Sequence, residues 1–189
     1  MIYLIRHGET NLNRERKFYG ELDISLNEQG IVQGQSLQEQ LNKITFSKIY
    51  TSHLKRTIEM AELVTQKSAT DFIMMRELGE KGFGLWEGLS ADEIEATFPK
   101  EWAAWLEQPF TITPPQAESF VQFKERVEKV FRDIYRSLRE EPETNILIVS
   151  HLGVLRLICQ LVEKDQEFWD IDIPQGTYKV IDNKRIELI

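Results

Sequence analysis

Residues 2–10, IYLIRHGET, join an apolar run from Ile2 to Ile5 directly to Arg6 and His7. The continuous apolar run predicts a strand buried within a sheet. A cation beside an imidazole has no use in a hydrophobic core, whereas a site that binds and attacks an anion needs both. Arg6 and His7 are therefore the first candidates for functional residues.

The rest of the chain alternates strand and helix patterns. Three expected helices begin with the spacing of a capping box, at Ser25 and Glu28, Ser90 and Glu93, and Ser119 and Gln122. We expect strands at 2–5, 47–52, 72–78 and 144–151, helices at 25–44, 53–66, 120–141 and 153–164, one or two short helices at 92–108 broken near Pro99, and a closing hairpin at 176–189 that turns near Asp182 and Asn183.

Strands separated by helices predict the α/β class, with a mainly parallel sheet between two helical layers in a three-layer α/β/α sandwich. The run TNILIVSH, residues 144–151, is the most apolar strand and is expected at the centre of the sheet. No repeat or linker divides the chain, so we expect a single domain over residues 1–189.

Composition limits the classes of partner. The net charge of −8 argues against a nucleic-acid or membrane surface, although a few basic groups in a cleft can still bind a small anion. The single cysteine, Cys159, cannot form an internal disulfide, and no signal or membrane-spanning pattern is visible, so a cytoplasmic protein is expected. A homodimer is left open.

Polar residues follow three of the expected strands. Arg6 and His7 end the first, Arg56 lies just after the second, and His151 follows the run ILIVS. Because ligands of open α/β sheets bind beyond the carboxyl ends of the strands, these side chains are expected to gather in one pocket for a phosphate or carboxylate. A lone strand-end histidine is more often structural, but three agreeing placements favour function.

The motifs LIRHGET, YTSHLKRTIEMA, LGEKGFGLWEG and VSHLGVLR, in this order, resemble the histidine phosphatase superfamily, which includes the cofactor-dependent phosphoglycerate mutases. The resemblance covers nearly the whole chain and implies a phosphoglycerate mutase-like fold. It implies that His7 is the nucleophile that becomes phosphohistidine, and that Arg6, Arg56 and His151 hold the phosphoryl oxygens.

The same resemblance places the general acid at Glu80, three residues before Phe83-Gly84, with Glu77 as the alternative. It implies a hydrogen bond from Asn13. We expect no cofactor, and no metal, because none of the three histidines lies at metal-ligand spacing from another. Further substrate-binding positions are expected at Gly8, Tyr19, Gly20 and Leu152. Two departures from the family pattern stand out, since Leu152 and the pair Gln116-Ala117 occupy positions where the family often has glycine.

A short chain leaves little room for the extra segments of the mutases, so hydrolysis of a phosphomonoester is favoured. The shorter members that the sequence resembles are alpha-ribazole phosphatases, which act in cobalamin biosynthesis on a substrate with an aromatic base. A broad-specificity phosphatase is the first alternative and a mutase the second. A phosphate-binding module without turnover is the non-enzyme alternative. Trp102 and Trp105, three residues apart, are expected to be core residues.

Overall fold

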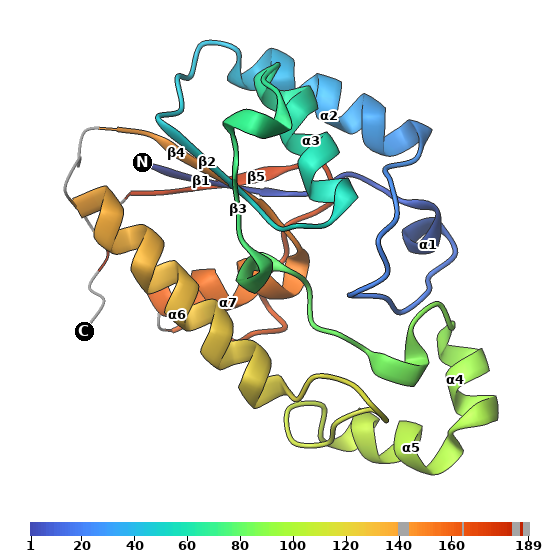
Figure 1. The fold of residues 1–189 in the computed structure, drawn as a ribbon. Coiled ribbons are helices and arrows are strands. Elements are labelled where there is room, and N and C mark those ends of the chain that lie inside the picture. Colours follow the sequence, from blue (N-terminus) through green and yellow to red (C-terminus); the bar gives the residue numbers. More distant parts are fainter. Residues whose placement is uncertain (140–143, 164, 183–185, 187–189) are drawn as a thin grey trace.

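The computed structural model describes residues 1–139, 144–163, 165–182 and 186. At its centre is a five-stranded sheet with the order β3-β2-β4-β1-β5 (Figure 1). All neighbouring strands are parallel except β5, which runs antiparallel to β1. The strands are β1 (Ile2–Arg6), β2 (Lys48–Thr51), β3 (Ile73–Met74), β4 (Ile146–Ser150) and β5 (Tyr178–Ile181).

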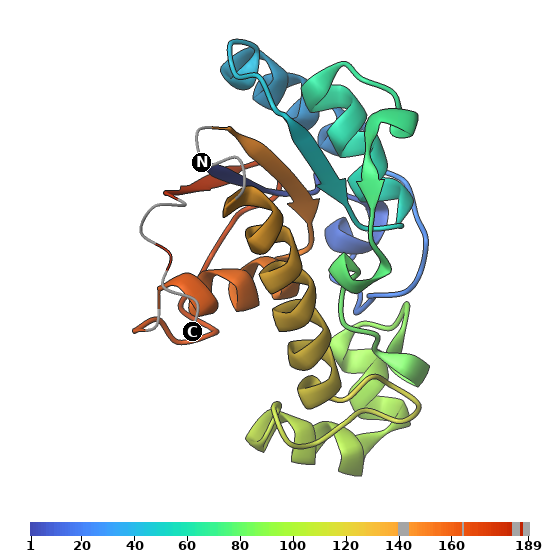
Figure 2. The ribbon, with the colours of Figure 1, turned by 60° about the vertical axis from the view of Figure 1, so that its left-hand side comes forward.

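Helices cover both faces of the sheet, as the alternating pattern predicted. On one face α2 packs beside α3, and on the other α6 packs beside α7 (Figures 1 and 2). The helices are α1 (Asn11–Arg14), α2 (Glu28–Leu41), α3 (Lys55–Thr65), α4 (Ala91–Thr97), α5 (Pro99–Glu107), α6 (Phe120–Arg139) and α7 (Leu152–Val162), with single 3₁₀ turns at Ala69–Asp71, Arg76–Leu78 and Gly84–Trp86. The predicted α/β/α sandwich with a mainly parallel sheet is confirmed.

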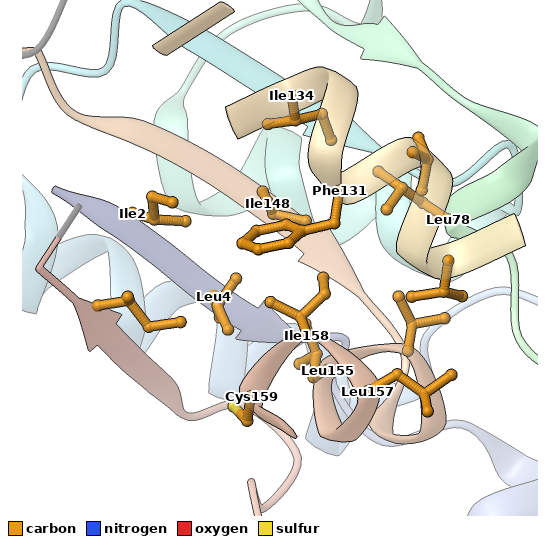
Figure 3. Close-up of a cluster of buried hydrophobic side chains, with 14 of the residues drawn as sticks. Ile2, Leu4, Leu78, Phe131, Ile134, Ile148, Leu155, Leu157, Ile158 and Cys159 are labelled. Carbon is orange, nitrogen blue, oxygen red and sulfur yellow. The ribbon is translucent and has the colours of Figure 1, made fainter. Parts of the chain in front are cut away.

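Alternate residues of each strand enter different cores, because successive side chains of a strand point to opposite faces. Ile2 and Leu4 of β1 pack with α6 and α7, whereas Ile5 packs with α2 and α3. Figure 3 shows the first of these cores, where Phe131 of α6 lies among side chains of β1, β4 and α7. β4 is buried at every position and lies in the middle of the sheet, as expected.

The segment from Gly84 to Glu107 forms a small cluster of its own. Trp86, Ile94 and Trp102 are buried in it, with Phe18 and Trp105 packed against them. The expectation of a core residue is confirmed for Trp102, whereas Trp105 is only partly buried against the cluster. The expected break at Pro99 separates α4 from α5. Both helices lie beyond the edge of the sheet, next to the start of α6 (Figures 1 and 2).

Several expected boundaries were wrong. α2 begins at Glu28 rather than Ser25, because the side chain of Asn27 accepts the N–H of Gly30 and caps the helix there. The strand expected at 72–78 is confined to Ile73–Met74, since a 3₁₀ turn follows it at the edge of the sheet. The first arm of the closing hairpin is present as β5, and most of the second arm lies outside the described residues.

Within the described ranges, none of the helices combines the length and apolarity that crossing a membrane requires.

Candidate active site

A pocket of about 370 Å³ opens where the parallel strands β1, β2 and β4 end. Among the described residues that line it, six are Lys or Arg and Glu80 alone is acidic. The pocket therefore has a positive field within a chain of net charge −8. The basic lining residues are Arg6, Arg16, Lys17, Arg56, Lys81 and Arg156.

His7 lies in the pocket wall directly after β1, with 4% of its surface exposed. Its Nδ1 lies 2.7 Å from the carbonyl oxygen of Gly8, which can only accept a hydrogen bond, so Nδ1 carries the proton. Burial, with the cations of Arg56 and Arg6 adding to it, lowers the pKa of His7 well below its usual value. The ring is therefore neutral near pH 7 and keeps a free lone pair on Nε2.

Arg6 reaches the pocket from the last position of β1. One Nη donates to the carbonyl of Ile173 at 3.1 Å, and Nε is buried without a hydrogen-bond partner among the described groups. A buried donor without a partner is costly, and an anion in the pocket supplies one. Burial lowers the pKa of Arg6, with Glu80 opposing that effect, but a guanidinium stays charged at any physiological pH.

Arg56, in the first turn of α3, is fully buried and shares its N–H groups among three acceptors. Its Nη groups donate to the carbonyls of Leu22 and Gly20 at 2.8 and 2.7 Å, and its Nε donates to Nδ1 of His151 at 3.3 Å. The guanidinium also lies 4.8 Å from the centre of the Tyr19 ring. Arg56 is thus fixed in position before any ligand arrives, which is what preorganised charge stabilisation requires.

His151 directly precedes α7, at the N-cap position, and has no exposed surface. Because Arg56 donates to Nδ1, the proton lies on Nε2, which donates to Oγ of Ser52 at 2.9 Å. Ser52 Oγ in turn lies 2.8 Å from Thr57 Oγ1, whose hydroxyl reaches the carbonyl of Leu54 at 2.8 Å. Burial, and then Arg56, lowers the pKa of His151 well below its usual value, so this ring is also neutral.

The ring centres of His7 and His151 lie 5.1 Å apart, and the backbone N–H of His7 donates to the carbonyl of Ser150. The parallel pairing of β1 with β4, which sets Arg6 opposite Ser150, brings the two histidines together. The structure therefore gathers Arg6, His7, Arg56 and His151 in one pocket.

Glu80 lines the pocket and Glu77 does not. The two carboxylate oxygens of Glu80 accept the backbone N–H groups of Lys81 at 3.0 Å and Gly153 at 3.1 Å. Glu77 is exposed on the 3₁₀ turn after β3. Of the two glutamates considered from the sequence, only Glu80 has a side chain at the pocket.

Asn13 and Tyr19 line the pocket as a hydrogen-bonded pair. Asn13 Oδ1 accepts bonds from the backbone and hydroxyl of Thr10, at 3.1 and 3.0 Å, and from the Tyr19 hydroxyl at 2.8 Å. Three donors on the oxygen leave the Nδ2 amino group as the end of Asn13 that is available to a ligand. Burial raises the pKa of Tyr19, so its hydroxyl keeps its proton.

Of the other three expected substrate-binding positions, one lines the pocket and two do not. Leu152 lines the pocket, where it occupies the first position of α7 with negative φ, so it forces no unusual loop. Gly8 and Gly20 are not among the lining residues. A Cβ on Gly8 lies 2.6 Å from the carbonyl oxygen of Gly30, and one on Gly20 lies 1.9 Å from that of Lys81. These two glycines permit close packing of backbone segments.

Several polar residues at or beside the site had not been selected from the sequence, namely Arg16, Lys17, Ser52, Lys81, Arg126 and Arg156. Ser52 and Arg156 lie within motifs that carried the family resemblance, and their places beside a strand end and a helix start were available signals. Lys81 follows Glu80 directly, whereas nothing in the sequence marked Arg126 within its long charged helix. In the part of the chain that the structure covers, no three His, Cys, Asp or Glu side chains cluster as metal ligands.

A model of the histidine phosphatase superfamily, branch 1, matches residues 2–186. The chain belongs to this superfamily. The resemblance that the four motifs indicated is confirmed, and it extends over nearly the whole chain.

Similar members of the superfamily are phosphatases of more than one named kind. The chain is 33% identical over 183 residues to the adenosylcobalamin/alpha-ribazole phosphatase of Escherichia coli K12, covering 96% of this chain and 89% of that one. It is 28% identical to phosphoserine phosphatase 1 of Hydrogenobacter thermophilus, covering 95% and 85%. The crystal structure of the alpha-ribazole phosphatase of Shigella flexneri superposes with a TM-score of 0.81 at 32% identity, covering 94% and 87%.

Proposed function

We propose that this member of the histidine phosphatase superfamily hydrolyses phosphate monoesters through a phosphohistidine intermediate, with alpha-ribazole 5′-phosphate of cobalamin biosynthesis as its substrate. The observation that carries the proposal is the hydrogen bond between His7 Nδ1 and the Gly8 carbonyl. This bond leaves a neutral imidazole with its Nε2 lone pair in a pocket lined by the guanidinium groups of Arg6 and Arg56. A nucleophile and its anion-binding groups are thus preorganised together.

The first half of the reaction transfers the phosphoryl group to the enzyme. The Nε2 lone pair of His7 attacks phosphorus, the bond from phosphorus to the ester oxygen breaks, and Glu80 gives a proton to the departing alkoxide. Arg6 and Arg56 bind the phosphoryl oxygens, where each well-placed donor contributes on the order of 3 kcal/mol.

The second half releases phosphate. Glu80 takes a proton from a water molecule, the resulting hydroxide attacks phosphorus, and the bond from phosphorus to Nε2 breaks. Phosphate leaves, and His7 and the protonated Glu80 return to their starting states. Acid–base catalysis of this kind contributes roughly 10²- to 10⁴-fold.

Alpha-ribazole 5′-phosphate is favoured as the substrate because two of the compared proteins are named alpha-ribazole phosphatases. Each is over 30% identical to this chain, with nearly complete coverage of it. The name phosphoserine phosphatase among similar proteins shows that the superfamily accepts other alcohols. A broad-specificity phosphatase is therefore the alternative to be tested, and a mutase is the second.

Acid-quench labelling tests the reaction. A ³²P-labelled monoester mixed with the enzyme and quenched in acid or in base is expected to leave a protein-bound phosphate that is labile in acid and stable in base, and His7→Ala is expected to abolish it. Retention of the label in His7→Ala, or no label in the wild type during turnover, would refute the phosphohistidine.

A substrate screen tests the assignment. We expect the highest kcat/KM with alpha-ribazole 5′-phosphate, compared with 3-phosphoglycerate and p-nitrophenyl phosphate, and no isomerisation of 3-phosphoglycerate. Equal values for all three esters would establish the broad-specificity alternative. Efficient isomerisation with little hydrolysis would establish a mutase.

A further inference from the structure

Among the aromatic side chains that line the same pocket as the phosphoryl-binding groups, four form a connected group that the reaction described above does not use. We name Phe110, Phe120, Phe168 and Trp169 the aromatic wall. Phe110 follows α5, Phe120 begins α6, and the other two follow α7. The centres of the rings lie 4.6 Å apart for Phe110 and Phe120, 5.6 Å for Phe110 and Trp169, and 4.9 Å for Phe168 and Trp169. The wall is therefore one contiguous surface.

Much of this surface is accessible. Trp169 is 51% exposed and Phe110 is 38% exposed, although their rings stack with an angle of 24° between their planes. Large rings left exposed within a pocket are typical of a binding surface rather than of a core. The pocket of about 370 Å³ also exceeds the needs of a phosphoryl group alone, since drug-sized ligands occupy pockets of roughly 300–1,000 Å³.

Arg156 adds a polar group to the wall. Its guanidinium lies 5.3 Å from the ring centres of both Phe168 and Trp169. Its Nε donates to the carbonyl of Ile171 at 2.7 Å, and among the described residues its Nη groups have no hydrogen-bond partner. The guanidinium thus lies beside both rings and is held there by the Ile171 carbonyl, with donors left for an acceptor on a ligand.

The wall is joined to the catalytic groups through the backbone. Ile171 accepts from Arg156, and Ile173, two residues later, accepts from Arg6. Arg156 also lies one turn after Gly153 on α7, the residue whose N–H binds the Glu80 carboxylate. A ligand that meets Arg6 and Glu80 therefore lies within reach of Arg156.

We infer that the aromatic wall and Arg156 form the subsite for the leaving alcohol, and that this alcohol carries a planar aromatic group with a hydrogen-bond acceptor on its edge. This inference rests on the proposed phosphatase reaction. The flat rings stack on the aromatic group, and the Arg156 Nη groups donate to the acceptor. A second phosphate on the substrate is a poorer match, because Arg156 faces rings and the Lys17 ammonium is already paired with Glu93 at 2.7 Å.

Two esters that differ by the aromatic base provide the test. Alpha-ribazole 5′-phosphate carries a benzimidazole with one free ring nitrogen, and ribose 5-phosphate lacks the base. We expect the wild type to prefer the base-bearing ester at least tenfold in kcat/KM. Trp169→Leu and Arg156→Met are each expected to reduce that ratio about tenfold, mainly by raising KM for the base-bearing ester.

Matched controls lie away from the pocket. Arg136→Met removes an exposed arginine of α6, and Tyr178→Leu removes a half-exposed ring of β5, and both are expected to leave the ratio unchanged. Thermal unfolding checks that all four variants fold. Equal losses for both esters in Arg156→Met would place Arg156 on the phosphoryl group and overturn the inference, as would a wild type that does not discriminate.

Failure of the inference differs from failure of the reaction. Acid-labile phosphate on His7 that forms equally fast from the two esters supports the phosphohistidine and refutes the subsite. No such phosphate from either ester refutes both.

Discussion

The Glu80 carboxylate accepts the backbone N–H of Gly153 at 3.1 Å, and glycine is required at 153 for that contact. A Cβ at this position lies 2.5 Å from Glu80 Oε1 and 3.2 Å from Cζ of Phe123. The carboxylate is the end of a flexible side chain, so an added methyl group displaces Glu80 more readily than it disrupts the helix. Gly153, rather than position 152, is where this site depends on the absence of a side chain.

Gly153→Ala is therefore expected to lower kcat about 10- to 100-fold for an ester whose leaving group needs a proton, because the displaced Glu80 no longer delivers one. The loss is expected to be several-fold smaller for p-nitrophenyl phosphate, whose leaving group is stable as an anion. Steady-state kinetics with both esters measure this, and thermal unfolding verifies the fold. An equal loss with the two esters would contradict a role of Gly153 in placing the acid.

Arg126 of α6 holds the backbone of the Glu80 segment. Its Nη groups donate to the carbonyls of Glu77 at 2.7 Å, Gly79 at 2.8 Å and Glu80 at 3.0 Å, and its guanidinium is paired with the carboxylate of Glu118. Arg126→Met is expected to lower kcat for a poor leaving group more than for p-nitrophenyl phosphate. Because three carbonyls and a carboxylate lose their donor, the free energy of unfolding is expected to fall by about 1–3 kcal/mol.

The matched control for Arg126 is Arg136→Met on the same helix. The Arg136 side chain is 75% exposed and pairs with Asp133 at the surface. We therefore expect kcat to stay at the wild-type value and the free energy of unfolding to change by no more than about 0.5 kcal/mol. Urea unfolding and kinetics with the two esters compare the variants. If Arg126→Met loses stability but keeps the wild-type ratio of the two kcat values, Arg126 supports the fold and does not position Glu80.

The position of the pocket could be predicted from the sequence because a single rule of sheet geometry was sufficient. Parallel strands bring their carboxyl ends to one edge, so Arg6, His7 and His151 could be placed together without coordinates. Local signals were weaker guides. Ser25 and Asn27 both suit a helix cap, and only the packed chain shows that Asn27 binds the N–H of Gly30.

The aromatic wall could not be predicted as one surface, because it joins Phe110, Phe120 and Trp169 from segments that no periodicity relates. Glycines were ambiguous for a different reason. Gly8 and Gly20 lie next to functional residues in sequence, yet the atoms that exclude a Cβ there belong to Gly30 and Lys81, which are distant along the chain. Both limits arise from tertiary contacts between separated segments.

Gln116, where the superfamily often has glycine, has a positive φ of 58°. The left-handed conformation costs a residue with a Cβ about 1 kcal/mol or more, and glycine adopts it freely. Because the Gln116 side chain is exposed, Gln116→Gly is expected to raise the free energy of unfolding by about 0.5–1 kcal/mol, measured by urea unfolding. Gln116→Ala removes the same side chain and keeps the Cβ, so no gain is expected. A gain in Gln116→Ala of equal size would show that the side chain, and not φ, is the cause.

The two buried histidines predict how stability depends on pH. Burial lowers the pKa of His7 and of His151 well below the value near 6.5 that an unfolded chain gives them. Below about pH 6.5 the unfolded chain therefore binds two protons that the folded protein does not, and unfolding becomes easier as the pH falls. At full effect the two sites give a slope of about 2.7 kcal/mol per pH unit, fully developed about one unit below pH 6.5.

Urea unfolding at pH 7.5, 6.5 and 5.5 measures this slope, and single variants divide it. His7→Gln and His151→Gln are each expected to remove about 1.4 kcal/mol per pH unit, because each deletes one proton-binding site from the unfolded chain. His53→Gln is expected to remove less, because burial and then Arg76 lower the pKa of this exposed imidazole, but not well below its usual value as for the two buried rings. If the slope between pH 6.5 and 5.5 is the same in all three variants as in the wild type, the buried rings already carry their protons in the folded protein. His7 would then lack the free lone pair on Nε2 that attack on phosphorus requires.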